Sequence, residues 1–337
     1  MARAKAPRYG IAEWYGKDIR TLTPEQRMAY GQTACRHEDN AATANVPVCP
    51  FLATLIPGAK CNKAGGVCSM RKFRETPQGV TAVEGLPVVT MCPTRFLQSV
   101  GDDLSFFSWL SSKMLDLPAP IVVKETPFLR KVSDVDQPTG EVVAVEEETD
   151  DDSKKAGRID WIIVNPATLT AAELDWCAIE TQAVYFSGKE MRLDFDIYAA
   201  APGPIIFPVV SRRPDYRSSG PKRLGPQLDV KVPVMRNWGK KVAVVVDRYF
   251  LENMNRLADP FPRARNDTER RDNADVVWFI VDYNEQLQLR PYRVTYTSLD
   301  SSRRALNATE PLSKSTFTDG LRAVIADPDM ANKVFTV

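Results

Sequence analysis

Apolar positions along the chain predict a mixed α/β protein. Two apolar runs near the middle have the character of buried strands, at 158–164 and 176–186, and an Asn165-Pro166 step breaks the chain between them. Valine-rich runs at 241–247 and 276–283 predict two later strands. Loops separate these runs, so we expect an α/β fold with a mixed sheet flanked by helices.

The first third of the chain has a different pattern. Short apolar runs alternate with proline and glycine before Phe96, which predicts a helix-poor domain over 1–115. The apolar residues from Phe96 to Leu117 predict a helix that ends before Pro118. Residues 116–337 are expected to form the core, with the last part of the chain adding helical or covering structure.

Each of the two central strands carries an acidic residue inside its apolar run. Asp160 lies in the first strand and Glu180 in the second. A carboxylate in a half-buried strand is costly unless it is paired, hydrogen-bonded or bound to a cation. Gln182 follows Glu180 by two residues and shares its face. Side by side, the strands would supply two hard oxygen ligands for magnesium and a polar group beside them, although such spacings also arise by chance.

The balance of charge also differs along the chain. The net charge is only +1, yet 134–152 holds nine acids and no base, whereas 211–241 holds nine bases and two acids. The acidic run at 146–152 is typical of a solvated loop. The basic stretch interleaves arginines with aromatic residues and suits a surface that follows a phosphate backbone, or a loop kept soluble by its charge. That acidic run and 218–220 are candidates for mobile segments.

Cysteines cluster in the first hundred residues. The chain has six cysteines and shows neither a secretory signal peptide nor an apolar run long enough to cross a bilayer, so we expect a reducing cytoplasm. Thiols there bind metal more often than they form disulfides. No repeated CxxC knuckle is present, and Cys35 with His37 could compete for a ligand position, so spacing alone leaves the ligand set open. The single histidine argues against Ser-His-Asp, Cys-His and multi-histidine zinc chemistry.

Several stretches, in order, resemble the NotI type of type II restriction endonucleases, enzymes with the PD-(D/E)xK nuclease fold. The matching stretches extend from about residue 10 to residue 285. They are Ile11-Ala12-Glu13-Trp14-Tyr15-Gly16, Cys49-Pro50-Phe51-Leu52, Cys61, Gly66-Val67-Cys68, Cys92-Pro93-Thr94-Arg95, Ile159-Asp160-Trp161, Glu180-Thr181-Gln182, Gly188, Gly225-Pro226-Gln227-Leu228 and Trp278-Phe279.

The resemblance implies a catalytic site. It assigns magnesium binding to Asp160 and Glu180, and it puts Gln182 where most relatives of the fold carry lysine. Because an amide brings no charge to the phosphate, charge stabilisation would come from the metal and from nearby basic residues. Glu125, preferred to Glu141, is expected as an extra acid from an earlier strand, although a solvent-facing carboxylate on an edge strand is an equal alternative.

The resemblance also implies a structural metal in the N-terminal domain. In the family four cysteines hold one iron, and the matched motifs place them at Cys49, Cys61, Cys68 and Cys92. Four thiolates suit iron or zinc about equally well, so iron is inherited from the resemblance alone. A shell of four protein ligands leaves no position for substrate, so this metal would stabilise the fold.

The expected function is that of a bacterial, cytoplasmic type II restriction endonuclease. It would hydrolyse double-stranded DNA at a palindromic, GC-rich site, leave 5′ phosphates and act as a homodimer, because a palindrome demands two sites related by a two-fold axis. Base and phosphate contacts are expected in 116–337, the PD-(D/E)xK-like nuclease core with its DNA-recognition elements. The candidates are Arg212, Arg213, Gln227, Lys231 and Arg236.

Two rival functions share these features. A structure-specific repair or recombination nuclease of the same fold would trim or nick ends and junctions instead of cutting at defined sequences. A non-catalytic, metal-stabilised DNA-binding protein would bind DNA in a salt-dependent way without cleaving it, and it would be indifferent to the loss of Asp160.

Overall fold

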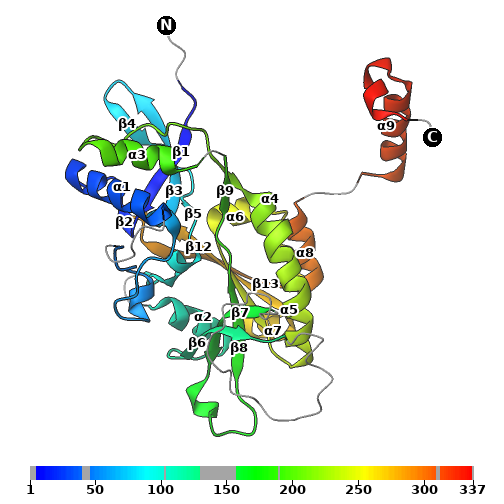
Figure 1. The fold of residues 1–337 in the computed structure, drawn as a ribbon. Helices are drawn as coiled ribbons and strands as arrows, with labels where there is room; N and C mark the ends of the chain where they lie inside the picture. Colours follow the sequence, from blue (N-terminus) through cyan, green and yellow to red (C-terminus); the bar gives the residue numbers. More distant parts are fainter. Residues whose placement is uncertain are drawn as a thin grey trace, which may run out of the picture.

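A six-stranded sheet forms the centre of the protein, which we describe from a computed structural model (Figure 1). The structure describes residues 5–39, 46–101, 104–129, 157–188, 190–308 and 312–335. Glu141 and the acidic run at 146–152 lie outside these residues. The strands follow the order β13-β12-β11-β8-β7-β6, and their bounds are β6 (Ile121–Pro127), β7 (Arg158–Val164), β8 (Trp176–Thr181), β11 (Val242–Asp247), β12 (Val276–Tyr283) and β13 (Leu289–Thr297).

The sheet is mixed, as the sequence predicts. β11 runs parallel to β8 and to β12, whereas β6, β7 and β8 are antiparallel neighbours and β13 is antiparallel to β12. β11 and β12 are buried along their whole length, which explains their continuous apolar sequence.

Helices cover both faces of this sheet. Helix α5 (Gly225–Asn237) and helix α8 (Leu299–Asn307) lie side by side on one face (Figure 1). Helix α2 (Phe106–Met114) packs on the other face, where Trp109 meets Phe279 edge to face with ring centroids 5.0 Å apart. Each strand therefore alternates between an α5 side and an α2 side, and this alternation decides which residues reach the site.

A second, smaller sheet is built from the N-terminal part of the chain. Its order is β2-β1-β3-β4, with β5 paired to β3, and its members are β1 (Arg8–Trp14), β2 (Lys17–Asp18), β3 (Val67–Thr76), β4 (Gly79–Ala82) and β5 (Val89–Thr90). Helix α1 (Pro24–Glu38) packs on α3 (Arg192–Ala200), which comes from much later in the chain. At their crossing a Cβ on Gly31 would lie 2.6 Å from the backbone nitrogen of Ala199, so only glycine allows this approach.

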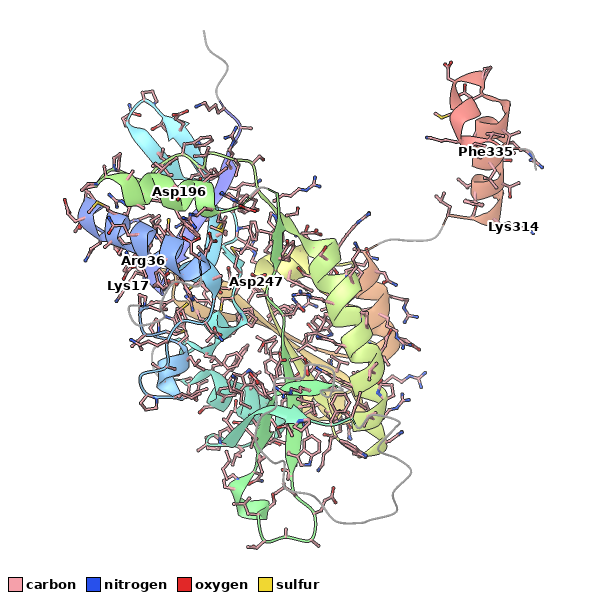
Figure 2. The ribbon with its side chains drawn as sticks, viewed as in Figure 1. Lys17, Arg36, Asp196, Asp247, Lys314 and Phe335 are labelled. Carbon is pink, nitrogen blue, oxygen red and sulfur yellow. The ribbon has the colours of Figure 1, made fainter. Side chains whose placement is uncertain are left out.

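Buried polar contacts join the smaller sheet to the six-stranded sheet. The Thr90 backbone N–H donates to Asp247 Oδ2 at 2.7 Å, and the Thr90 hydroxyl lies 2.6 Å from the hydroxyl of Tyr283. Asp247 lies near the middle of the molecule (Figure 2). Both hydrophobic clusters contain residues from each side of residue 115. The boundary at 115 therefore stays a prediction, and the two parts of the chain share their cores.

The remaining elements are short or peripheral. They are β9 (Tyr185–Ser187), β10 (Arg213–Asp215), α4 (Tyr216–Ser219), α6 (Arg248–Glu252), α7 (Asp267–Asn273) and α9 (Lys314–Ala326). Helix α9 buries none of its residues and stands apart from the rest of the chain, as the labels at Lys314 and Phe335 show (Figure 2). Among the described residues, the helices are all too short or too polar to cross a membrane.

The structure corrects three expectations. The helix predicted over 96–117 is only α2, because the Ser105 side chain accepts the Ser108 N–H and so caps a helix that begins at residue 106. The strand predicted over 176–186 ends at Thr181 and resumes as β9. Residues 218–220, expected to be mobile, lie in α4 and in a π-helical turn, and Ser219 and Gly220 are buried.

Candidate active site

The two suspected carboxylates meet across neighbouring strands. β7 and β8 are antiparallel with Trp161 opposite Ile179, so Asp160 and Glu180 occupy the next position of the same register. Trp161 and Ile179 belong to the cluster on the α2 side, so the alternation of each strand turns Asp160 and Glu180 to the side covered by α5. The sequence prediction that these strands lie side by side is confirmed.

Glu180 is deeply buried. Only 1% of the residue is exposed, and burial raises the pKa of its carboxyl to about 7, with the nearby Asp160 charge raising it further and Lys231 opposing the rise. Lys231 Nζ on α5 lies 2.6 Å from Glu180 Oε1. At this distance the ammonium forms a charge-assisted contact with the carboxylate, and this contact opposes the rise of the Glu180 pKa. The charge of Glu180 is therefore balanced inside the protein.

Asp160 is half-buried and fixed by its neighbour on β8. The Thr181 backbone N–H and the Thr181 hydroxyl both donate to Asp160 Oδ2 at 2.9 Å. Two donors on one oxygen orient the carboxylate before any ligand arrives. The strand pairing and Thr181 together fix the Asp160 carboxylate next to Glu180.

Gln182 lies just beyond the end of β8. Its backbone N–H donates to the Val245 carbonyl at 3.0 Å, which keeps the chain against β11. Its side-chain Nε2 donates to the Ala183 carbonyl at 2.5 Å, so the amide is turned to its own backbone. It is nearly buried and lies on the same side of the chain as Glu180, but it bonds neither carboxylate in this structure.

Glu125 lies in the same row of the sheet without joining the pair. β6 pairs with β7 through Lys124 opposite Trp161 and Thr126 opposite Ile159, so Glu125 falls opposite Asp160. Its backbone has a φ of 51°, and its carboxylate forms ion pairs with Lys124 at 2.6 Å and Arg158 at 3.4 Å. In the parts of the chain that the structure describes, no three Asp, Glu, His or Cys side chains gather closely enough to hold a metal ion. Glu125, the extra acid expected from the sequence, therefore lies next to Asp160 in the sheet but forms ion pairs with Lys124 and Arg158.

The carboxylate pair fits the way proteins bind magnesium. Magnesium keeps several of its waters and is bound through one or two carboxylates together with substrate phosphates. Asp160 and Glu180 supply one carboxylate each from neighbouring strands, and Thr181 orients the first of them. The donor set is hard oxygen throughout, which suits magnesium or manganese better than soft metals.

The four matched cysteines share a neighbourhood at the edge of the smaller sheet. Cys49 and Cys61 flank a bridge between Val48 and Lys60, and the Cys92 backbone N–H donates to the Cys68 carbonyl at 3.2 Å. Burial raises the pKa of the Cys61 thiol to about 11, with Cys49 and Cys92 adding to the rise.

These thiols do not form a closed metal shell in the structure. Among the described residues all six cysteines are free thiols, and no three of them are arranged to hold a metal ion. Cys35, which competed for a ligand position, donates its thiol to Asp196 Oδ1 at 3.4 Å, and Cys177 is buried on the α2 side of β8. The ligand set therefore stays a prediction.

Arg95, from the Cys-Pro-x-Arg stretch, has a structural role. Its buried guanidinium donates to Glu13 Oε2 at 2.6 Å and to Gln98 Oε1 at 2.8 Å, and it also bonds the Leu287 carbonyl. The group lies 4.9 Å from the ring centroid of Tyr283. Arg95 thus links the cysteine-containing segment to the smaller sheet and to the end of the six-stranded sheet.

The five candidates for DNA contact have different surroundings. Arg212 is buried and pairs with Asp194 at 2.6 Å, and Lys231 is buried against Glu180. Arg213, Gln227 and Arg236 are exposed. Two of the candidates are therefore buried in ion pairs, and the other three are exposed and accessible to DNA.

The sequence predicts a DNA contact for Lys231, whereas its side chain is buried against Glu180. The buried positions of α5 and of the turn before it are Leu224, Leu228, Lys231, Val232 and Met235. This is the spacing of one helix face, and lysine occupies one of its positions. A charged residue in an apolar helical stripe was the signal that could have identified it.

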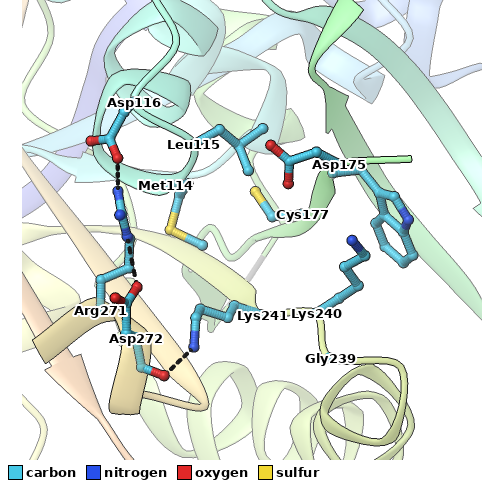
Figure 3. A pocket seen from close by; sticks show the side chains of 11 residues that line it. Met114, Leu115, Asp116, Asp175, Cys177, Gly239, Lys240, Lys241, Arg271 and Asp272 are labelled. Atoms are coloured by element: carbon cyan, nitrogen blue, oxygen red, sulfur yellow. Dashed lines mark hydrogen bonds and ion pairs between the residues drawn. The ribbon is translucent and has the colours of Figure 1, made fainter. Parts of the chain in front are cut away.

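A hollow between α2, β8 and α7 contains neither of the two carboxylates (Figure 3). It lies at the start of β8, beside Trp176 and Cys177, whereas Glu180 is near the end of that strand. Several of its charges are already satisfied, since Arg271 pairs with Asp116 at 2.9 Å and Lys241 donates to the Asp272 carbonyl at 2.8 Å. The hollow and the carboxylate pair therefore lie at opposite ends of β8.

Comparison with known proteins shows the family of the chain. No curated protein matches the chain. A family model described as restriction endonuclease NotI matches residues 38–294, a range that includes both carboxylates, Gln182 and Lys231. The match covers well over half of the chain, which therefore belongs to the NotI family of restriction endonucleases and is a type II site-specific deoxyribonuclease.

Proposed function

We propose that this endonuclease cleaves DNA with magnesium held by Asp160 and Glu180. The observation that carries the proposal is the placement of the two carboxylates at one position of the β7–β8 register, one oriented by Thr181 and the other buried against α5. Bound magnesium would supply an activated water and offset the charge that develops on the phosphate.

The chain's own residues supply orientation and a dry environment. Thr181 holds Asp160 through two hydrogen bonds, so this carboxylate needs little reorganisation when its ligand arrives. The burial of Glu180 excludes bulk water from one side of the site. Gln182 can donate and accept only neutral hydrogen bonds, and its side chain must turn away from the Ala183 carbonyl to orient a water molecule. Attack of water in line with the departing 3′ oxygen would leave a 5′ phosphate.

Three exposed basic side chains near the site support a DNA-binding surface. Arg213, Arg217 and Lys222 line one hollow together with Tyr249 and Asn253. Arg213 lies on β10, which pairs with β9 just beyond the end of β8. Cations grouped this way suit the phosphate backbone, and we propose that they position the duplex over the carboxylate pair. Gln227 and Arg236, exposed on α5, stay candidates for base or phosphate contacts.

The substrate is proposed to be a palindromic, GC-rich site in double-stranded DNA. Cutting both strands of a palindrome requires two active sites related by a two-fold axis, so the enzyme would act as a homodimer. Family membership supports both proposals. The activity would belong in the bacterial cytoplasm, where incoming DNA is met.

The cysteine cluster is proposed to hold iron or zinc with a structural role. Cys49, Cys61, Cys68 and Cys92 are partly or fully buried near one another, and four thiolates suit either metal. Cys68 lies on the smaller sheet near Arg95, and a shell of four thiolates leaves no position for substrate, so metal there would stabilise the fold.

Substitution of Asp160 tests the catalytic proposal. Asp160→Asn keeps the shape of the side chain but removes a charged ligand, and we expect magnesium-dependent cleavage to fall by about 10²-fold or more. Binding of the cognate duplex, measured with calcium in place of magnesium, should stay within a few fold of the parent. Cleavage at the parental rate by Asp160→Asn would exclude this carboxylate from the site.

A further inference from the structure

Lys231 occupies an unusual position for a lysine. Helix α5 covers the face of the sheet that carries Glu180, and its inward stripe is otherwise apolar, with Leu228, Val232 and Met235 buried. Lys231 lies in this stripe and is only 6% exposed. Its ammonium lies 2.6 Å from Glu180 Oε1.

An apolar side chain would satisfy this position at lower cost for the fold. A buried ion pair is often no more stabilising than well-packed apolar residues, because both charges must lose their hydration. A lysine stem has about the length of methionine, which would continue the stripe between Leu228 and Val232. Packing therefore gives no reason for a charge at this position.

The chain at the end of β8, in contrast, supplies no cation to the carboxylate pair. Gln182, which the resemblance places where most relatives of the fold carry lysine, is neutral, and its amide donates to the Ala183 carbonyl. Among the residues that the structure describes, Lys231 is the one lysine or arginine that forms an ion pair with Asp160 or Glu180. The cation of this site thus reaches it from a helix and not from the strand.

The local sequence explains how α5 brings Lys231 to the site. The residues before it form a π-helical turn over Gly220–Leu224, in which the Gly225 N–H donates to the Gly220 carbonyl. Pro226 has no N–H and cannot bond the preceding turn, which favours this wider winding. The extra residue in the turn rotates the face of the helix that follows, and that face places Lys231 above β8.

We propose that Lys231 is the lysine of this active site, supplied by α5 in place of the residue at position 182, and that it positions Glu180 and balances its charge. The inference rests on the proposed magnesium-dependent function. It assigns to a helix residue the contribution that a strand residue makes in relatives that carry lysine at that position.

The first test is Lys231→Met, which keeps the length of the stem and removes the charge. We expect the rate of cleavage at saturating DNA to fall by about 10²-fold or more, as for the loss of one preorganised charged group. Val232→Ala is the matched control, because it removes buried packing from the same helix without touching the site. That control should lower the melting temperature and keep the cleavage rate of the folded protein.

Metal binding provides a readout that a merely structural role would not give. Manganese binding to the DNA-free protein should be several-fold tighter in Lys231→Met, because the ammonium no longer competes with the metal for the Glu180 carboxylate. Calorimetry measures this binding at a pH high enough to keep Glu180 ionised in both proteins, since the loss of Lys231 removes the contact that opposes the rise of the Glu180 pKa. A site that had simply collapsed would bind manganese more weakly than the parent, and that result would overturn the proposal.

A lysine returned to the strand should restore activity. In the double variant Lys231→Met/Gln182→Lys we expect at least a tenfold recovery of the cleavage rate over Lys231→Met alone. No recovery would show that lysine at position 182 cannot replace Lys231. Cleavage by Lys231→Met within threefold of the parent would overturn the proposal as a whole.

Failure of the parent protein to cleave with magnesium would refute the proposed function instead. Failure of the Lys231 proposal can therefore be told apart from failure of the proposed function.

Discussion

Replacing Glu180 by glutamine should remove a specific part of the pH dependence of folding. Burial and the Asp160 charge raise the pKa of Glu180 from 4.5 to about 7, so the folded protein binds this proton more tightly than the unfolded chain does. A carboxyl group with a raised pKa makes folding more favourable as the pH falls. The gain begins as the pH falls through the folded pKa and is complete below the unfolded pKa.

The two pKa values set the size of the effect. Between pH 8 and pH 5 a single group with these values adds on the order of 2 kcal/mol to the free energy of unfolding of the parent. Glu180→Gln has no such proton, so its stability should change with pH by on the order of 2 kcal/mol less over the same interval. Groups common to both proteins that do not interact with Glu180, including Asp247 with its pKa raised by burial to about 6, cancel in this difference.

Urea unfolding at pH 8, 7, 6 and 5 in the presence of a chelator measures this quantity. Glu173→Gln is the matched control, because the Glu173 side chain is 84% exposed and its neutralisation should leave the pH dependence unchanged. Equal pH dependence in Glu180→Gln and in the parent would refute the account of a buried carboxyl group with a raised pKa at this position.

Two other substitutions test other parts of the account. Thr181→Val removes the hydroxyl that donates to Asp160 Oδ2 and keeps the backbone donor. We expect about tenfold slower cleavage with the melting temperature nearly unchanged. An unaltered cleavage rate would show that this hydrogen bond does not orient the carboxylate. Cys68→Ser should lose bound iron or zinc and lower the melting temperature, whereas Cys177→Ser should keep the metal. Elemental analysis of the two purified proteins checks this, and equal metal content in both would contradict the proposed cluster.

Much of the central sheet could be predicted from the sequence. The strand at 158–164 was predicted with its observed bounds, and those at 241–247 and 276–283 to within one residue at their ends. Buried strands carry continuous apolar runs, and that signal does not depend on distant parts of the chain. Asp160 and Glu180 could be singled out for the same reason, since an acid within such a run is costly without a partner.

The start of α1 and the length of α2 differ from the expectation, although local sequence signals mark both. Helix α1 begins with a capping box in which Thr23 and Gln26 bond each other's backbone, and Pro24 follows the cap; this signal was present in a region expected to be poor in helix. The length of α2 was overestimated because apolar character alone does not show where Ser105 starts the helix.

Tertiary contacts account for the rest of the site. The roles of Arg212 and Lys231 could not be read from charge, because each pairs with an acid that lies far away in sequence or on another element. Charge in the basic stretch predicted a surface for DNA, yet these two side chains point inward. Whether a cation is buried depends on the packed structure. For Lys231 alone, the helical spacing of its apolar neighbours in the sequence indicates an inward-facing position.

The most direct test is digestion of long bacteriophage or bacterial DNA by the purified protein, with magnesium and with chelator, followed by sizing and sequencing of the ends. The account predicts discrete, magnesium-dependent fragments whose ends carry 5′ phosphates and share one palindromic, GC-rich sequence. Heterogeneous trimming from ends, or DNA that is bound and left intact in magnesium, would contradict it.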